Sequence, residues 1–160
     1  MRRKFAVLFA ALLALGYAAP ARADITAFIG ANTTPANRTV RGGAVGLGLV
    51  IVGLELEYAN TRLDERVPAP ELKTGMGNLY LQTPVPILGF QPYLTTGAGL
   101  FREKDATHSK MGLGSNMGGG VKIKLAGPIR LRVDYRNFRL GRGVLATPTH
   151  RVYAGLSLSF

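Results

Sequence analysis

The chain has 160 residues, no cysteine, and 20 Lys and Arg against nine Asp and Glu, which gives a formal charge of +11 at pH 7. The lack of cysteine excludes disulfides, thiolate metal sites and cysteine nucleophiles. Since 21 glycines and nine prolines accompany a hydrophobic content of 47%, the composition is unusual for a soluble core.

The first residues have the form of an export signal. A basic start over residues 2–4 precedes an apolar run over 5–19, and residues 21–23, Ala-Arg-Ala, match the small-x-small site of a signal peptidase. The run is shorter than the roughly 20 apolar residues of a transmembrane helix. We therefore predict a cleaved signal peptide over 1–23 and one domain over 24–160, which remains basic.

Beyond the signal, apolar and polar side chains alternate along eight segments. A period of two places successive side chains on opposite faces of a β-strand. The alternation is strictest over residues 129–136, and the last segment ends on an aromatic residue, Phe160. A length of roughly 9–13 residues is close to what a tilted strand needs to cross a bilayer. The predicted strands cover residues 24–34, 43–51, 54–59, 74–82, 90–102, 111–125, 129–136 and 152–160.

The predicted connections alternate in character. Those after the second, fourth and sixth strands, at 51–53, 83–89 and 126–128, are short or contain tight Pro and Gly turns. Those after the other strands are longer and polar, as at 61–73 and 103–110. Short turns on one rim and long loops on the other are typical of an outer-membrane barrel with both termini on the periplasmic side.

The signal, the eight strands, the segment PIRLRVDYRNF at 128–138 and the terminal Phe160 resemble the bacterial outer-membrane β-barrel family of OmpA-like transmembrane domains and eight-stranded porin-family proteins. The resemblance implies an all-β fold, an eight-stranded antiparallel up-and-down transmembrane β-barrel in the Gram-negative envelope. It also implies that the barrel assembly machinery reads Phe160 as an insertion signal. The alternative is an aromatic anchor at the membrane interface. Since closure leaves no free sheet edge, we expect a monomer.

Alternation alone does not decide which face lies outside. A membrane barrel turns its apolar face to lipid, whereas a lipocalin-like barrel would bury it and carry an apolar ligand. Eight strands enclose only a narrow interior, in which small residues would make room for long charged side chains. We therefore favour the membrane arrangement, and the small lumen residues are Ala44, Gly46, Gly48, Thr95, Gly97 and Gly99.

The charged residues of the polar face predict an ion-pair network across the lumen. We expect Glu55 and Glu57 to face Arg130 and Arg132 near the periplasmic end; the alternative is a wet lumen with hydrated charges. The cations outnumber the acids, so any leak should favour anions. The predicted network comprises Glu55, Glu57, Lys122, Lys124, Arg130, Arg132, Asp134 and Arg136.

The long-loop rim carries further basic residues, with Arg38, Arg41, Lys110 and Arg151 among them. Arg and Lys suit phosphate oxygens, so part of this rim is expected to contact lipopolysaccharide; the alternative is a solvated rim. The candidates are Arg62, Arg66, Lys73, Arg102, Lys104, Arg139 and Arg142. Nucleic acid is not an expected partner, because the chain is exported and its cations are dispersed. With no Trp, an aromatic girdle would use Tyr58, Phe90, Phe101 and Tyr135.

Catalytic chemistry has little support. His108 and Ser109 share a loop with Glu103 and Asp105, which suggests a Ser/His/acid hydrolase like the barrel lipid A deacylases, but the spacing matches no motif. Two distant histidines support no metal site. We predict a protein without enzymatic activity or cofactor, either an envelope scaffold or a minor small-solute passage with a mostly occluded lumen. The alternative is a binding module, either lipocalin-like or adhesive through its loops.

Overall fold

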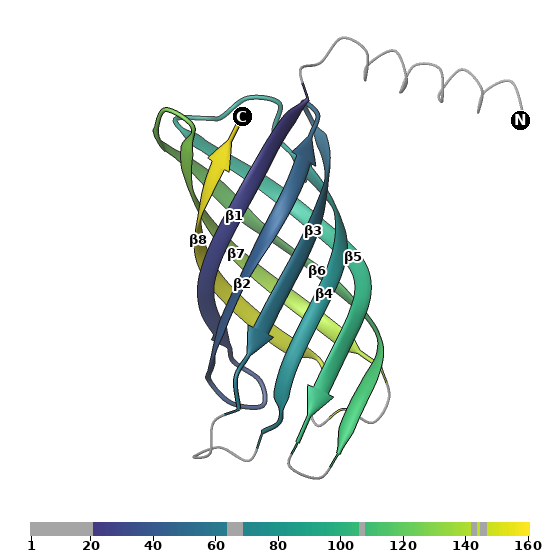
Figure 1. Cartoon of the computed structure of the whole chain (residues 1–160). Helices are drawn as coiled ribbons and strands as arrows, with labels where there is room; N and C mark the ends of the chain where they lie inside the picture. The colour runs from purple at the N-terminus through teal and green to yellow at the C-terminus, as the bar shows by residue number, and fades with distance from the viewer. Residues whose placement is uncertain (1–20, 64–68, 106–107, 142–143, 145–146) are drawn as a thin grey trace, which may run out of the picture.

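The computed structural model is a closed antiparallel barrel in which each of eight strands pairs with its neighbours in the chain (Figure 1). It describes residues 21–63, 69–105, 108–141, 144 and 147–160. The predicted all-β, eight-stranded, up-and-down fold is confirmed. The strands are β1 (Arg22–Asn32), β2 (Arg38–Gly48), β3 (Val52–Thr61), β4 (Glu71–Gln82), β5 (Phe90–Lys104), β6 (Ser109–Ala126), β7 (Ile129–Leu140) and β8 (Thr149–Ser159).

The two rims of the barrel differ, and the start of β1 and the carboxy-terminus lie together at one of them (Figure 1). That rim carries the connections 49–51, 83–89 and 127–128. The opposite rim carries the connection 105–108, which is shorter than the polar loop predicted over 103–110. The reason is that β5 and β6, with 15 and 18 residues, pair with each other as far as Lys104 and Ser109, and β6 continues there beyond its pairing with β7.

The seam between β1 and β8 closes the barrel next to the carboxy-terminus. Ala23 and Phe160 exchange two backbone hydrogen bonds, with N to O distances of 2.8 and 2.9 Å. β1 begins at Arg22, two residues before the predicted mature start, so cleavage after Ala23 would remove this pair of bonds. The rest of the predicted signal, residues 1–20, lies outside the described part of the chain.

The aliphatic side chains of the strands face outward. Leu56, Leu94 and Leu156 are 67%, 69% and 56% exposed, whereas Glu57 and Arg132 are buried inside. The lipocalin-like alternative requires the reverse arrangement, with the aliphatic face lining the interior. Among the described residues, no helix has the length and hydropathy of a transmembrane segment.

The predicted aromatic girdle is only partly on the outside. Tyr58, Phe90 and Tyr135 are exposed on the outer surface, but Phe101 is buried in the lumen. The assignment of Phe101 to the girdle is therefore wrong. It lies two residues beyond Gly99 in the same strand, and side chains two apart share a face.

Candidate functional site: the barrel lumen

Two groups of side chains at different heights fill much of the lumen, and a smaller buried cluster of Phe28, Val40, Ala59 and Tyr153 lies beside them. The charged network, as we name it, extends from the short-turn rim to the middle of the barrel. The apolar cluster lies beyond it, toward the long-loop rim. The charged network comprises Asp24, Glu55, Glu57, Lys122, Arg132, Asp134, Arg136 and Arg151. The apolar cluster comprises Leu72, Met76, Phe101, Phe138 and Leu140.

Arg136 of β7 is the centre of the charged network. Its guanidinium lies 2.8 Å from Glu55 Oε1, 2.9 Å from Glu57 Oε2 and 3.4 Å from Asp134 Oδ1. The Arg136 side chain is fully buried. Since Glu55 and Glu57 lie on β3, across the barrel from β7, this one side chain ties opposite walls together.

Two further arginines extend the pairing along the barrel axis. Arg132 Nη1 donates to Glu55 Oε2, and Arg132 Nε donates to Asp134 Oδ2 at 2.6 Å. At the other end Arg151 Nη1 donates to Glu57 Oε1 at 3.1 Å. The two glutamates therefore each contact two guanidinium groups, so the carboxylate charge is shared along a continuous chain.

Uncharged side chains add further hydrogen bonds to this core. Tyr153 donates its hydroxyl to Glu57 Oε2 at 3.0 Å, and Tyr93 donates to Asp134 Oδ2. Arg151 also donates to Asn32 Oδ1 at 3.0 Å and to Thr74 Oγ1 at 3.2 Å. These bonds matter because a buried charge is tolerated when partners satisfy its remaining donors and acceptors.

A separate pair closes the short-turn end. Lys122 Nζ lies 3.1 Å from Asp24 Oδ2 and 4.5 Å from the centroid of the Tyr80 ring. Gly46 makes this pair possible, since a Cβ built there would stand 2.5 Å from Asp24 Oδ1. The small residue predicted to make room in the lumen thus admits a carboxylate from the neighbouring strand.

The structure brings together most of the predicted network residues but not all of them. Lys124 is exposed at the end of β6, where the pairing with β7 shifts register between Lys124 and Ala126. Arg130 is half-buried near the rim, where its Nη1 donates to Gln91 Oε1 at 3.2 Å. The placement of Lys124 in the network and the pairing of Arg130 with Glu55 and Glu57 are therefore wrong, because both cations lie too close to the short-turn rim.

Two network members were missed from the sequence. Arg151 was assigned to the long-loop rim but is fully buried with Glu57, and Asp24 was treated only as the start of the domain. Spacing could have found both: Arg151 lies two residues before the inward Tyr153, and Asp24 two before the inward Thr26. With both included, four acids pair with four cations, so the charged network itself carries no excess of positive charge.

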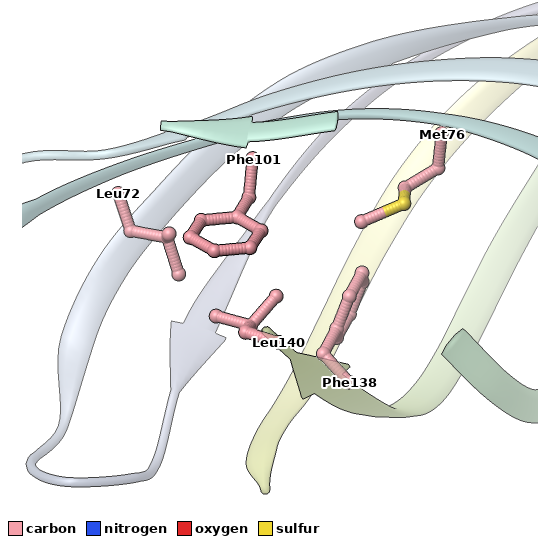
Figure 2. Close-up of a cluster of buried hydrophobic side chains, with 5 residues drawn as sticks. All are labelled: Leu72, Met76, Phe101, Phe138 and Leu140. Atoms are coloured by element: carbon pink, nitrogen blue, oxygen red, sulfur yellow. The ribbon is translucent and has the colours of Figure 1, made fainter. Parts of the chain in front are cut away.

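The apolar cluster is the second feature that was not predicted. Leu72 and Met76 of β4, Phe101 of β5, and Phe138 and Leu140 of β7 are buried and turn toward one another inside the barrel (Figure 2). The Arg151 guanidinium carbon lies 4.3 Å from the centroid of the Phe138 ring. This cation–π contact joins the apolar cluster to the charged network, so the lumen is filled continuously across this junction.

The predicted lipopolysaccharide contacts are spread over the long-loop half of the barrel. Arg102, Lys104 and Arg139 are exposed, and so is Arg62 at the end of β3. Lys73 is half-buried beside Glu71, with 3.2 Å between its Nζ and Glu71 Oε1. Arg66 and Arg142 lie outside the described residues.

Comparison with known proteins identifies the fold. No family model matches the sequence, and no curated protein matches it. The chain is similar to the N-terminal β-barrel domain of Pseudomonas aeruginosa OprF, with a TM-score of 0.66, 16% identity, and coverage of 89% of this chain and 99% of that one. It is also similar to the Yersinia pestis outer membrane protein Ail in a phospholipid nanodisc, with a TM-score of 0.53, 14% identity, and coverage of 88% and 100%.

A third similar structure is the outer membrane enzyme PagL, with a TM-score of 0.50, 12% identity, and coverage of 86% and 98%. At these identities the likeness concerns the fold and not the activity. The chain therefore has the fold of the eight-stranded outer-membrane β-barrels, as the resemblance of its sequence implied.

Proposed function

We propose that the chain is an outer-membrane β-barrel protein that serves as an envelope scaffold and not as a route for solutes. The outward aliphatic side chains support the membrane placement, because in water such a continuous apolar surface would drive association. Every strand of the barrel is paired on both sides. A closed sheet satisfies its backbone groups within lipid and needs no partner subunit, which supports a monomer.

The observation that carries the scaffold role is the filling of the lumen. A solute would have to separate Arg136 from three carboxylates and then displace the apolar cluster. Removing one partner from a buried ion pair costs about 3–5 kcal/mol. A stable aqueous path through the described lumen would require several such changes at once.

The carboxy-terminus supports insertion by the barrel assembly machinery. Phe160 is exposed on the outside and directly follows Ser159, which pairs with Asp24 at the seam where the barrel closes. An aromatic residue at this position is available to a receptor before the seam forms. The proposed role of Phe160 as an assembly signal rests on this accessibility together with the family resemblance.

The proposed scaffold is not an enzyme. The Ser109 hydroxyl, one member of the hydrolase combination considered from the sequence, accepts a hydrogen bond from Arg102 Nε at 3.2 Å. Within the described part of the chain, no group of three or more His, Asp or Glu side chains is arranged to hold a metal ion. The hydrogen bond between Arg102 and Ser109 joins β5 to β6 at the long-loop rim.

Conductance in a planar lipid bilayer tests the scaffold role. We expect the purified, folded protein to insert and to produce no stable conductance steps in molar potassium chloride. A heat-modifiable band on a gel and recovery in the outer-membrane fraction would establish that the inserted species is the barrel. Regular ohmic steps from this species would refute the sealed lumen and would leave the membrane placement intact.

A further inference from the structure

A row of polar side chains crosses the outer face of four neighbouring strands near the long-loop rim, and three of these strands contribute cations. Arg41 of β2 pairs with Asn60 of β3, Asn60 pairs with Lys73 of β4, and Lys73 pairs with Arg102 of β5. Neighbouring strands lie about 4.8 Å apart, so the row spans roughly 14 Å. Lys104 lies two residues beyond Arg102 on the same face. We call Arg41, Lys73, Arg102 and Lys104 the cationic row.

The cationic row keeps an excess of positive charge. Its one acidic neighbour among the described residues of this face is Glu71, which pairs with Lys73 at 3.2 Å. Arg41 and Arg102 are exposed. Side chains in this position point away from the barrel, so the exposed guanidinium groups of Arg41 and Arg102 can meet an anion in the headgroup layer.

A shallow apolar groove begins directly beside the cationic row. The next outward-facing positions toward the middle of the barrel are Gly43 on β2, Tyr58 on β3 and Gly75 on β4. Gly43 pairs with Tyr58, and Tyr58 pairs with Gly75. The groove has a volume of about 620 Å³ and continues over Leu56 and Gly77. It meets a second apolar groove of about 770 Å³, which runs toward the short-turn rim.

Glycines make the floor of the groove. A Cβ built at Gly75 meets no atom within 4 Å, and at Gly77 the nearest atoms are Ala98 O at 3.8 Å and Leu56 Cδ2 at 3.9 Å. These two glycines are therefore not required by close packing inside the protein. Their effect is to leave a recess on the lipid side of β4.

We propose that the cationic row and the groove together form a binding site for lipopolysaccharide. The phosphates of its headgroup lie on the cationic row, and one acyl chain lies in the groove over Gly75 and Gly77. Several cations spread over roughly 14 Å suit a headgroup with two separated phosphates, whereas phosphatidylglycerol offers only one. This assignment rests on the proposed placement in the outer membrane.

Filling the groove tests the site without removing any charge. Gly75→Leu should occupy the recess and be tolerated by the fold, since its Cβ meets open space and a larger side chain suits a strand better than glycine does. We expect this variant to bind lipopolysaccharide at least about tenfold more weakly in native mass spectrometry from detergent. A second variant combines Arg41→Gln, Lys73→Gln and Arg102→Gln. Its affinity for lipopolysaccharide should fall by a similar or larger factor, because charge-assisted hydrogen bonds are removed.

A control variant separates the site from general attraction between charges. Lys124→Gln removes an exposed cation at the opposite rim, outside the groove. It should retain lipopolysaccharide like the parent. Equal retention by all variants, or equal binding of phosphatidylglycerol by the parent, would overturn the site while the barrel stays folded and inserted. A parent chain that does not insert at all would instead contradict the proposed function.

Discussion

Replacing Arg136 with methionine is expected to lower the free energy of unfolding by about 3–5 kcal/mol. Arg136 is fully buried and contacts Glu55, Glu57 and Asp134 at 2.8, 2.9 and 3.4 Å. Methionine keeps much of the length of the side chain but removes the charge. The three carboxylates would then remain buried in the lumen without the positive charge of Arg136. A buried charge that has lost its partner lowers the stability of the fold.

Urea unfolding in detergent micelles, followed by loss of β-sheet circular dichroism, measures this change. Arg139→Met is the matched control, since Arg139 lies on the same strand with its side chain exposed, and we expect it to change the free energy of unfolding by less than about 1 kcal/mol. Adding Glu57→Gln to Arg136→Met should restore part of the loss. Equal midpoints for the two arginine variants would show that the lumen charges are hydrated individually.

Replacing Phe101 with alanine is expected to cost about 3–5 kcal/mol, the range for removing a large buried aromatic side chain. Phe101 is 1% exposed and packs in the apolar cluster with Leu72, Met76, Phe138 and Leu140 (Figure 2). Truncation leaves a cavity in a closed barrel whose backbone is fixed by pairing on both sides. The lining therefore cannot collapse easily, which places the cost toward the upper part of the range.

The control for this variant is Phe90→Ala on the same strand, because Phe90 is 50% exposed on the outer surface. In the same urea titration we expect a clearly smaller loss for Phe90→Ala than for Phe101→Ala. Similar losses would mean that Phe101 also faces lipid, as a member of the aromatic girdle. The apolar cluster would then not seal the long-loop half of the lumen.

The alternation of side chains was sufficient to predict the fold and the face of most strand residues. The strict pattern over residues 129–136 fixed Arg132, Asp134 and Arg136 inside, where the structure has them buried. The same alternation continues to Phe138 in β7 and also places Phe101 of β5 and Arg151 of β8 inside. Phe101 is misplaced because an apolar side chain is expected to face outward, whereas Phe138 and Arg151 are missed because the predicted strands end at 136 and begin at 152.

The partners inside the lumen could not be predicted in the same way. The alternation along a strand shows which face a side chain occupies. Its partner across the barrel depends on the shear of the strands, which cannot be read from the sequence. Glu57 thus meets Arg136 and Arg151 instead of Arg130. Local irregularities in strand pairing also limit what the sequence can predict. The register shift next to Lys124 lies in a segment whose alternation of apolar and polar residues looks regular.

We infer that the aliphatic faces of the strands touch lipid while the charged faces fill the lumen. Because the chain has no cysteine, single cysteines at Leu56, Leu94 and Leu156 can carry a fluorophore, with Asn37 in an exposed loop as the control. In vesicles, fluorescence from the three leucine positions should be quenched by brominated acyl chains and not by iodide, and fluorescence from Asn37 should show the reverse. Quenching by iodide alone at the leucine positions would contradict the account.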